Sequence, residues 1–287
     1  MAATQIARRK FGHLDSPVSA LGQGTWEIER AERSEAIEAL RRGIDLGMTH
    51  LDTAEMYGAG EAEEIVGDAI AGRRDQVFLV SKVLPSNASL RGTIAACEKS
   101  LKRLKTDRLD CYLLHWRGQY KLSDTIAAFE QLKSDGKIVS WGVSNFDKDD
   151  LEEALVIAGE GKIACNQVLY HLQERAIEHE VIPWCEKHGV AVVGYSPFGS
   201  RGGFPSTDSS GYKALQEVAD LHSATVRQIA LSFLTRRSSL FSIPKTANAV
   251  HAADNAWAGN VKLTDEDIEK IDSAFPLGKK PRSLPMI

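Results

Sequence analysis

Short apolar runs alternate with amphipathic segments from residue 19 almost to the end of this 287-residue chain, and this alternation limits the fold more than any other feature. Eight runs have the length and composition of strands. They are residues 19–24, 49–52, 76–82, 109–115, 138–144, 163–167, 190–195 and 240–244. Several are apolar almost throughout, which is typical of strands that are covered on both faces.

The segments between these runs have the spacing of amphipathic helices. Ile37, Leu40 and Ile44 recur at helical intervals in one of them, and similar patterns follow the later strands. Eight strands separated by helices predict a (β/α)₈ TIM barrel rather than an open sheet. Although 287 residues could form two domains, barrels of this size are often one domain. We therefore expect a single domain over residues 1–287.

Two segments lie outside the eightfold count. The turn signal Asp15-Ser16-Pro17 separates two short runs near the N-terminus, which predicts a hairpin that plugs one end of the barrel. After the last strand, Thr264 followed by acidic residues predicts an extra helix, and a proline-bearing tail follows from residue 276.

Polar side chains end the strands directly behind apolar residues. Asp52, Lys82 and His115 end the second, third and fourth strands, and Tyr57 follows Asp52 by five positions. Because barrel enzymes build their sites at the carboxyl ends of the strands, we expect these four side chains to converge. An unpaired buried charge is costly, so a purely structural barrel would not place ionisable groups there.

The four residue types suit proton transfer to a carbonyl oxygen. Tyr57 holds its proton at neutral pH, and a nearby Lys82 ammonium would lower its pKa and make it a usable acid. Asp52 would keep Lys82 charged, and His115 would orient the carbonyl. Since no side chain supplies hydride, reduction of that carbonyl requires a nicotinamide cofactor.

Seven motifs in order carry a family resemblance that covers nearly the whole chain. They are HLDTAEMYG, FLVSKV, DCYLLHW, WGVSNF, CNQVLYH, GYSPFG and SIPKTANAVHAADN. With these motifs the chain resembles the aldo-keto reductases, and within them the bacterial members that reduce small 2-oxoaldehydes such as methylglyoxal. The resemblance implies a catalytic tetrad of Asp52, Tyr57, Lys82 and His115, with Tyr57 as general acid.

The resemblance also implies where an NADPH cofactor binds. Ser144, Asn145 and Gln167 would hold the nicotinamide carboxamide, and the ring of Tyr195 would stack on the nicotinamide. The full set of expected cofactor residues is Gly24, Thr25, Trp26, Asp52, Ser144, Asn145, Gln167, Tyr195, Ser196, Pro197, Phe198, Ser200, Ile243, Lys245, Thr246, His251, Asp254 and Asn255. The substrate pocket would be formed by Trp26, Tyr57, His115 and Trp116, and residues 196–211 could fold over the cofactor as a lid.

His251 departs from the family pattern, which often has a phosphate-binding arginine at this position. A histidine lacks the bidentate fork of an arginine, so the grip on the 2′-phosphate of NADPH is weaker. Lys245 and Thr246 can still engage a phosphate. We therefore expect NADPH as the cofactor, with NADH as an alternative donor.

Other readings of the sequence are weaker. The glycines of residues 58–60 begin a GxGxx pattern but lack the third glycine of a dinucleotide-binding fingerprint. A Schiff-base lyase would use Lys82 as a nucleophile, but Asp52 should keep that lysine protonated. A cofactor-binding regulatory subunit remains an alternative, although all four tetrad residues are present.

Composition restricts partners and compartment. A formal net charge of −4 gives no case for nucleic acid or an anionic membrane. The four cysteines show no metal or disulfide spacing, and there is no HExxH cluster, so we expect free thiols and no metal. The N-terminus lacks a signal-like apolar segment. We expect a cytoplasmic, monomeric enzyme that acts on a small carbonyl compound.

Overall fold

The computed structural model describes residues 6–200 and 203–287. In these residues, eight parallel strands follow one another around a barrel in sequence order. They are β3 (Gly22–Gly24), β4 (His50–Asp52), β5 (Phe78–Val83), β6 (Leu109–Leu114), β7 (Ile138–Ser144), β8 (Ile163–Leu169), β9 (Ala191–Tyr195) and β10 (Leu240–Ser242). The first and last strands close the barrel, since the Gly24 amide donates to the Pro244 carbonyl at 3.1 Å and the Ser242 amide to the Ala20 carbonyl at 2.9 Å. The predicted (β/α)₈ barrel is confirmed.

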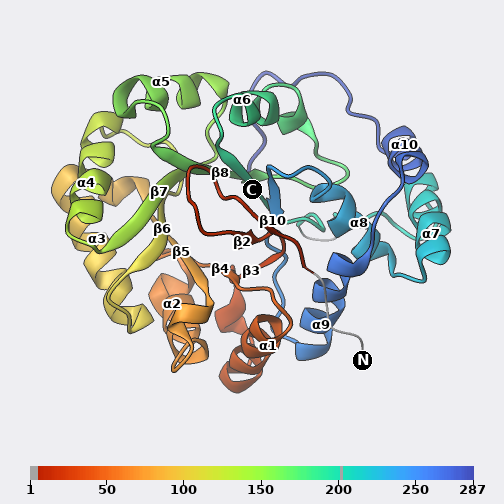
Figure 1. Cartoon of the computed structure of the whole chain (residues 1–287), viewed down its shortest axis with the longest axis horizontal. Coiled ribbons are helices and arrows are strands. Elements are labelled where there is room, and N and C mark those ends of the chain that lie inside the picture. The colour runs from red at the N-terminus through yellow and green to blue at the C-terminus, as the bar shows by residue number, and fades with distance from the viewer. Residues whose placement is uncertain (1–5, 201–202) are drawn as a thin grey trace.

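Helices surround the strands, and α7 and α10 pack together at one outer edge (Figure 1). The α-helices are α1 (Arg33–Asp45), α2 (Glu61–Ala69), α3 (Leu90–Leu104), α4 (Leu122–Ser134), α5 (Lys148–Ala158), α6 (Val181–Lys187), α7 (Ser210–His222), α8 (Val226–Leu234), α9 (Ala249–Trp257) and α10 (Asp265–Ala274). Short 3₁₀ helices are η1 (Ile28–Arg30), η2 (Tyr57–Gly60), η3 (Arg74–Gln76), η4 (Pro85–Asn87), η5 (Ala176–Glu178) and η6 (Ala258–Asn260). Capping boxes start α8 at Thr225 and α10 at Thr264, so the predicted extra helix is confirmed.

The N-terminal hairpin closes one end of the barrel, as predicted. Its strands, β1 (Arg8–Arg9) and β2 (Val18–Ser19), pair antiparallel. Between them, Phe11 is fully buried inside the barrel, with ring centroids 4.8 Å from Phe78 and 5.0 Å from Phe241. The first predicted strand, residues 19–24, was wrong in one respect: Ser19 belongs to the hairpin, and the barrel strand begins at Gly22.

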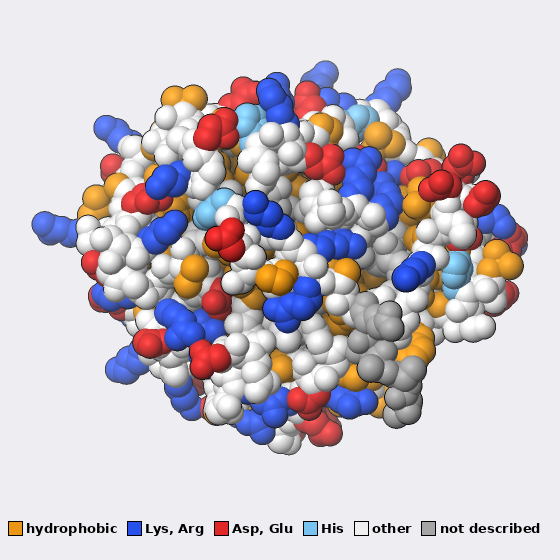
Figure 2. Space-filling view, viewed as in Figure 1, with side chains coloured by type: hydrophobic (Ala, Val, Ile, Leu, Met, Phe, Trp, Pro, Cys, Tyr) orange, Lys and Arg blue, Asp and Glu red, His pale blue; other side chains and the backbone are white. Residues whose placement is uncertain are grey.

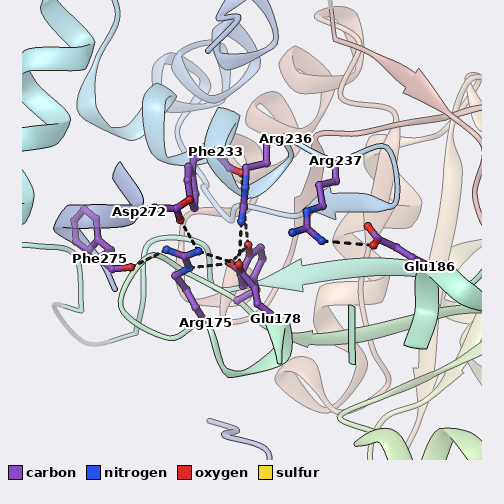
Figure 3. Close-up of polar contacts among 9 residues, drawn as sticks. Arg175, Glu178, Glu186, Phe233, Arg236, Arg237, Asp272 and Phe275 are labelled. Atoms are coloured by element: carbon purple, nitrogen blue, oxygen red, sulfur yellow. Dashed lines mark hydrogen bonds and ion pairs between the residues drawn. The ribbon is translucent and has the colours of Figure 1, made fainter. Parts of the chain in front are cut away.

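A buried ionic cluster joins the loop after β8 to α8 and α10 (Figure 3). Glu178 accepts hydrogen bonds from Arg175 at 2.8 and 2.9 Å, from Tyr170 at 2.6 Å and from Arg236 at 3.0 Å. Arg175 also contacts Asp272 and donates to a backbone carbonyl at the end of α10. Burial alone would raise the pKa of Glu178, but the bonds from Arg175 and Tyr170 and the charge of Arg236 lower it to about 2. These contacts tie segments distant in the sequence to one another.

The surface mixes both signs of charge, and acidic and basic side chains lie near one another around the rim of the face in Figure 2. Cys97, Cys111, Cys165 and Cys185 are buried and unpaired, as predicted. None of the helices in the described ranges has both the length and the apolar character needed to cross a membrane.

Candidate active site

The alternation of side chains along each strand brings three predicted catalytic residues to the barrel axis. Successive residues of a strand point to opposite faces. On β5, Leu79 packs in the outer layer and Val80 in the core inside the barrel, so Lys82, two positions later, also points inward. The same two-residue step leads from His50 to Asp52 on β4 and from Leu113 to His115 after β6.

Tyr57 reaches the same point from the turn after β4. It begins η2, in which Gly58 has φ 55° and Gly60, the residue before α2, has φ 101°. Such left-handed conformations favour glycine. A side chain at Gly58 would also collide with Glu29, whose Cγ lies 2.6 Å from the position of a Cβ. The turn therefore depends on these glycines, and it directs Tyr57 back over the strand ends.

Lys82 connects the other members of the group. Its Nζ atom donates to Asp52 Oδ1 at 2.6 Å, to the Thr53 carbonyl at 2.9 Å and to the Tyr57 hydroxyl at 3.2 Å. The side chains of Lys82 and Asp52 are 0% and 2% exposed. The second carboxylate oxygen of Asp52 accepts from Gln167 at 2.7 Å. Each buried charge therefore has a partner, which makes its burial tolerable.

The protonation states follow from this geometry. Burial alone would lower the pKa of Lys82, but the Asp52 carboxylate and the Tyr57 hydroxyl raise it, so Lys82 stays charged. Burial raises the pKa of Tyr57 above its usual value, and the Lys82 ammonium offsets only part of that rise. The expected net lowering of the Tyr57 pKa is therefore wrong, because burial outweighs the ammonium. Tyr57 holds its proton throughout the physiological range.

His115 lies edge-on to Tyr57, with the ring centroids 5.6 Å apart. Burial, and then the charge of Lys82, lowers the pKa of His115 to about 2, so its ring is neutral at pH 7. A neutral imidazole has one N–H donor, which can hold a carbonyl oxygen without adding a second positive charge beside Lys82.

These residues border a cavity of about 150 Å³. Its lining residues are Gly24, Thr25, Trp26, Asp52, Met56, Tyr57, His115, Trp116, Ser144, Asn145, Gln167, Tyr195, Ser196, Ile243, Lys245 and Ile287. The cavity thus brings together eleven of the expected cofactor residues and all four expected substrate residues. Lys82 lies beneath this surface and acts on it through Tyr57.

Amide and hydroxyl groups line one side of the cavity. The Tyr195 hydroxyl donates to Asn145 Oδ1 at 2.8 Å, while Asn145 Nδ2 donates to the His115 carbonyl and to Ser144 Oγ, both at 3.2 Å. Asn145 and Ser196 have φ of 59° and 51°, a conformation that is uncommon outside glycine and is concentrated at functional sites. The amide oxygen of Gln167 accepts no hydrogen bond from a described residue.

Seven of the expected cofactor residues lie outside this cavity. Pro197, Phe198 and Ser200 follow β9, Thr246 follows β10, and His251, Asp254 and Asn255 lie on α9. His251 is exposed, whereas Asn255 is buried. Within the candidate lid at 196–211, residues 201–202 lie outside the described residues.

The sequence prediction missed Met56 as a wall residue, whereas the tail from Pro276 to Ile287 is expected from the sequence as a candidate wall and does supply Ile287. Met56 directly precedes Tyr57, and this adjacency to a predicted catalytic residue is the signal that could have identified it. Ile287 belongs to the tail, which reaches the cavity from a distant part of the sequence. No periodic pattern could have placed that residue.

Known proteins resemble this chain in both sequence and fold. Residues 20–275 match the model of the aldo/keto reductase family. The methylglyoxal reductase YeaE of Escherichia coli (strain K12) is 42% identical over 95% of this chain and 96% of its own length, and the glyoxal reductase of Bacillus subtilis (strain 168) is 35% identical over 88% and 87%. A crystal structure of the Klebsiella pneumoniae aldo/keto reductase, in complex with NADP and acetate, superposes with a TM-score of 0.91 at 41% identity, covering 98% of this chain and 99% of that one. The chain belongs to the aldo/keto reductase family and is an oxidoreductase.

Proposed function

We propose that this enzyme uses NADPH to reduce small aldehydes and ketones, including 2-oxoaldehydes such as methylglyoxal. The observation that carries the proposal is the contact of the Lys82 ammonium with both the Asp52 carboxylate and the Tyr57 hydroxyl, at 2.6 and 3.2 Å, beside a cavity. The methylglyoxal and glyoxal reductase activities named for two relatives support the choice of substrate class.

Each residue has a defined task in this reaction. Tyr57 gives its proton to the carbonyl oxygen as negative charge develops there. The Lys82 ammonium stabilises the phenolate that remains, and Asp52 keeps Lys82 charged. His115 holds the carbonyl oxygen near Tyr57 with its single N–H. Because the charged lysine is not a nucleophile, the same geometry argues against a Schiff-base lyase.

The polar wall of the cavity has the chemistry needed to hold a carboxamide. The free amide oxygen of Gln167 can accept a hydrogen bond, Ser144 and Asn145 lie beside it, and the ring of Tyr195 offers a stacking surface. A bound nicotinamide would supply the hydride that no side chain can provide. The NADP complex of the structural relative supports the choice of cofactor.

The rest of the cavity favours small substrates. Trp26, Met56, Trp116 and Ile287 form apolar walls around a volume of about 150 Å³. We also infer that the enzyme works in the cytoplasm as a monomer. Free buried thiols suit a reducing compartment, and gel filtration should show one species near 31.4 kDa; elution at twice that mass would contradict the monomer.

The test is oxidation of NADPH with methylglyoxal, comparing the wild type with Tyr57→Phe. The variant should bind NADPH, as measured by cofactor fluorescence, but lose about 10²- to 10⁴-fold in turnover, the usual contribution of a general acid. Tyr120→Phe is a matched control, because Tyr120 is 38% exposed and lies outside the cavity.

Two outcomes would contradict the proposal. Full turnover by Tyr57→Phe would remove its role as the acid. A wild-type protein that binds NADPH tightly, but oxidises it with no carbonyl in a panel of methylglyoxal, glyceraldehyde, sugar aldehydes and pyridoxal, would instead favour a regulatory subunit.

A further inference from the structure

Arg227, the second residue of α8, places its guanidinium against two aromatic rings. Its Cζ atom lies 4.8 Å from the ring centroid of Phe198 and 4.9 Å from that of Phe204. The two rings meet edge to face, with centroids 5.8 Å apart. Contacts with two rings restrict the movement of the guanidinium more than a contact with one ring would. The guanidinium lies over the faces of the rings, so these contacts do not occupy its N–H groups.

The N–H groups of Arg227 are available for a ligand. The side chain is exposed, and it forms no hydrogen bond or ion pair with any residue in the described ranges. By contrast, Arg103 and Arg236 donate to carboxylates. A guanidinium carries its charge at all physiological pH values, and its fork of donors matches the oxygens of a phosphate. Arg227 is therefore a cation held against two rings, with N–H donors that no described residue occupies.

Arg227 lies beside the start of α9. Gln228 Nε2 donates to Asp254 Oδ1 at 2.7 Å, and Ser232 Oγ donates to the Ala258 carbonyl at 3.0 Å. Both partners advance by four residues from the first contact to the second, from 228 to 232 on α8 and from 254 to 258 on the other segment. The helix α8 and the segment that begins with α9 therefore run side by side in the same direction. The first turn of α8, with Arg227, thus lies next to the first turns of α9, where His251 is exposed.

Phe198 connects this arrangement to the proposed cofactor site. It packs against an apolar cluster that includes a residue from α8, Leu231, and one from α9, Ala256. It also follows Ser196, which lines the cavity, by only two residues. A cofactor that extends from the cavity toward α9 would therefore pass the Phe198 ring and the guanidinium held against it.

We propose that Arg227 binds the 2′-phosphate of NADPH and so sets the preference for NADPH over NADH. The inference rests on the proposed function, since it assigns one more residue to the same cofactor. Position 251 carries a histidine without a bidentate fork, and Lys245 offers a single ammonium. Arg227 supplies the paired donors that a phosphate dianion requires.

The experiment measures dissociation constants for NADPH and NADH by titration of the full-length protein. Arg227→Ala should weaken NADPH binding by about 10- to 100-fold, the usual effect of losing a hydrogen bond between charged groups. NADH binding should stay within about twofold, because NADH lacks the 2′-phosphate. Arg227→Lys, which keeps the charge but loses the fork, should recover part of the NADPH affinity.

Arg91→Ala is the matched control. Arg91 is also the exposed second residue of a helix, α3, with no side-chain hydrogen bond or ion pair to a described residue, and it lies outside the cavity. The Arg91→Ala variant loses the same charge and should change neither the NADPH nor the NADH dissociation constant. A loss confined to NADPH in Arg227→Ala, absent in Arg91→Ala, supports the proposal.

Three results would overturn the inference. Equal losses for NADPH and NADH would mean that Arg227 contacts the shared part of the cofactor or only supports the loop. Unchanged affinity for both cofactors would mean that Arg227 does not touch the cofactor. An equal loss of NADPH affinity in Arg91→Ala would mean that the effect of Arg227→Ala comes from net charge alone. Failure of the wild type to bind either cofactor would instead refute the proposed function itself, so the two failures are distinguishable.

Discussion

Replacing Lys82 and Asp52 together should destabilise this enzyme less than the two single replacements do in sum. The two side chains are almost completely buried, and the ammonium and carboxylate are 2.6 Å apart. Without the ammonium, Gln167 is the one side-chain donor to the Asp52 carboxylate that remains among the described residues. An uncompensated buried charge of this kind costs about 3–5 kcal/mol.

Asp52→Asn should have a similar cost, because the buried Lys82 ammonium would lose its negative partner and would contact only neutral groups among the described residues, the new amide at position 52, the Thr53 carbonyl and the Tyr57 hydroxyl. The double variant Asp52→Asn/Lys82→Met has neither charge. We therefore expect its loss of unfolding free energy to be smaller than the sum of the two single losses by at least about 2 kcal/mol.

Urea unfolding of the four proteins at pH 7, followed by circular dichroism, gives this coupling energy as a double-mutant cycle. The exposed pair Lys137–Glu98, at 2.6 Å, is the control, and its coupling should not exceed about 1 kcal/mol. If the losses at Asp52 and Lys82 simply add, the buried pair is not held by mutual compensation, and the reasoning about the site's charges is refuted.

Three further predictions concern pH and cofactor choice. With the pKa of His115 at about 2 and that of Tyr57 raised, kcat/KM should be flat from about pH 5 to about pH 9; a limb near pH 6.5, where a free histidine titrates, would contradict the neutral imidazole. Glu178 has its pKa lowered to about 2, so its carboxylate stabilises the fold fully above the unfolded pKa near 4.5, and this contribution disappears as the pH falls toward 2. Glu178→Gln should thus cost about 3 kcal/mol at pH 7 by urea unfolding, and a difference from wild type that stays constant down to pH 2 would refute this. His251→Arg should raise the NADPH-to-NADH ratio of kcat/KM by about tenfold, and an unchanged ratio would show that position 251 does not reach the phosphate.

Much of the barrel and the positions of the proposed catalytic residues could be predicted because both depend on short-range periodicity. The apolar runs located the strands to within a few residues. A parallel barrel brings all its strand ends to one rim, so a polar residue that ends a strand can be assigned to the site without knowledge of the other strands. Asp52, Lys82 and His115 were placed by this rule alone.

Properties that depend on several distant segments could not be predicted. The net pKa shift of Tyr57 is a balance between burial and one ammonium, and sequence shows the ammonium but not the depth of burial. The contact of Arg227 with Phe198 and Phe204 depends on the path of the loop after β9. Ser19 lies within an apolar run, so its place in the hairpin became evident only when Val18 was seen to pair with Arg9.

The hairpin that carries Phe11 covers one end of a barrel whose interior is packed with side chains such as Val80 and Leu113. Because the aromatic rings of Phe11, Phe78 and Phe241 fill that end, the cofactor and the carbonyl compound have to reach the cavity from the rim that Trp26 and Trp116 line. Two ligands that enter one cavity from the same side cannot bind independently. The ligand that binds deeper has to enter before the other and leave after it. We therefore expect the two ligands to bind and leave in a fixed order, which the packed barrel interior favours although it contributes no atom to the chemistry.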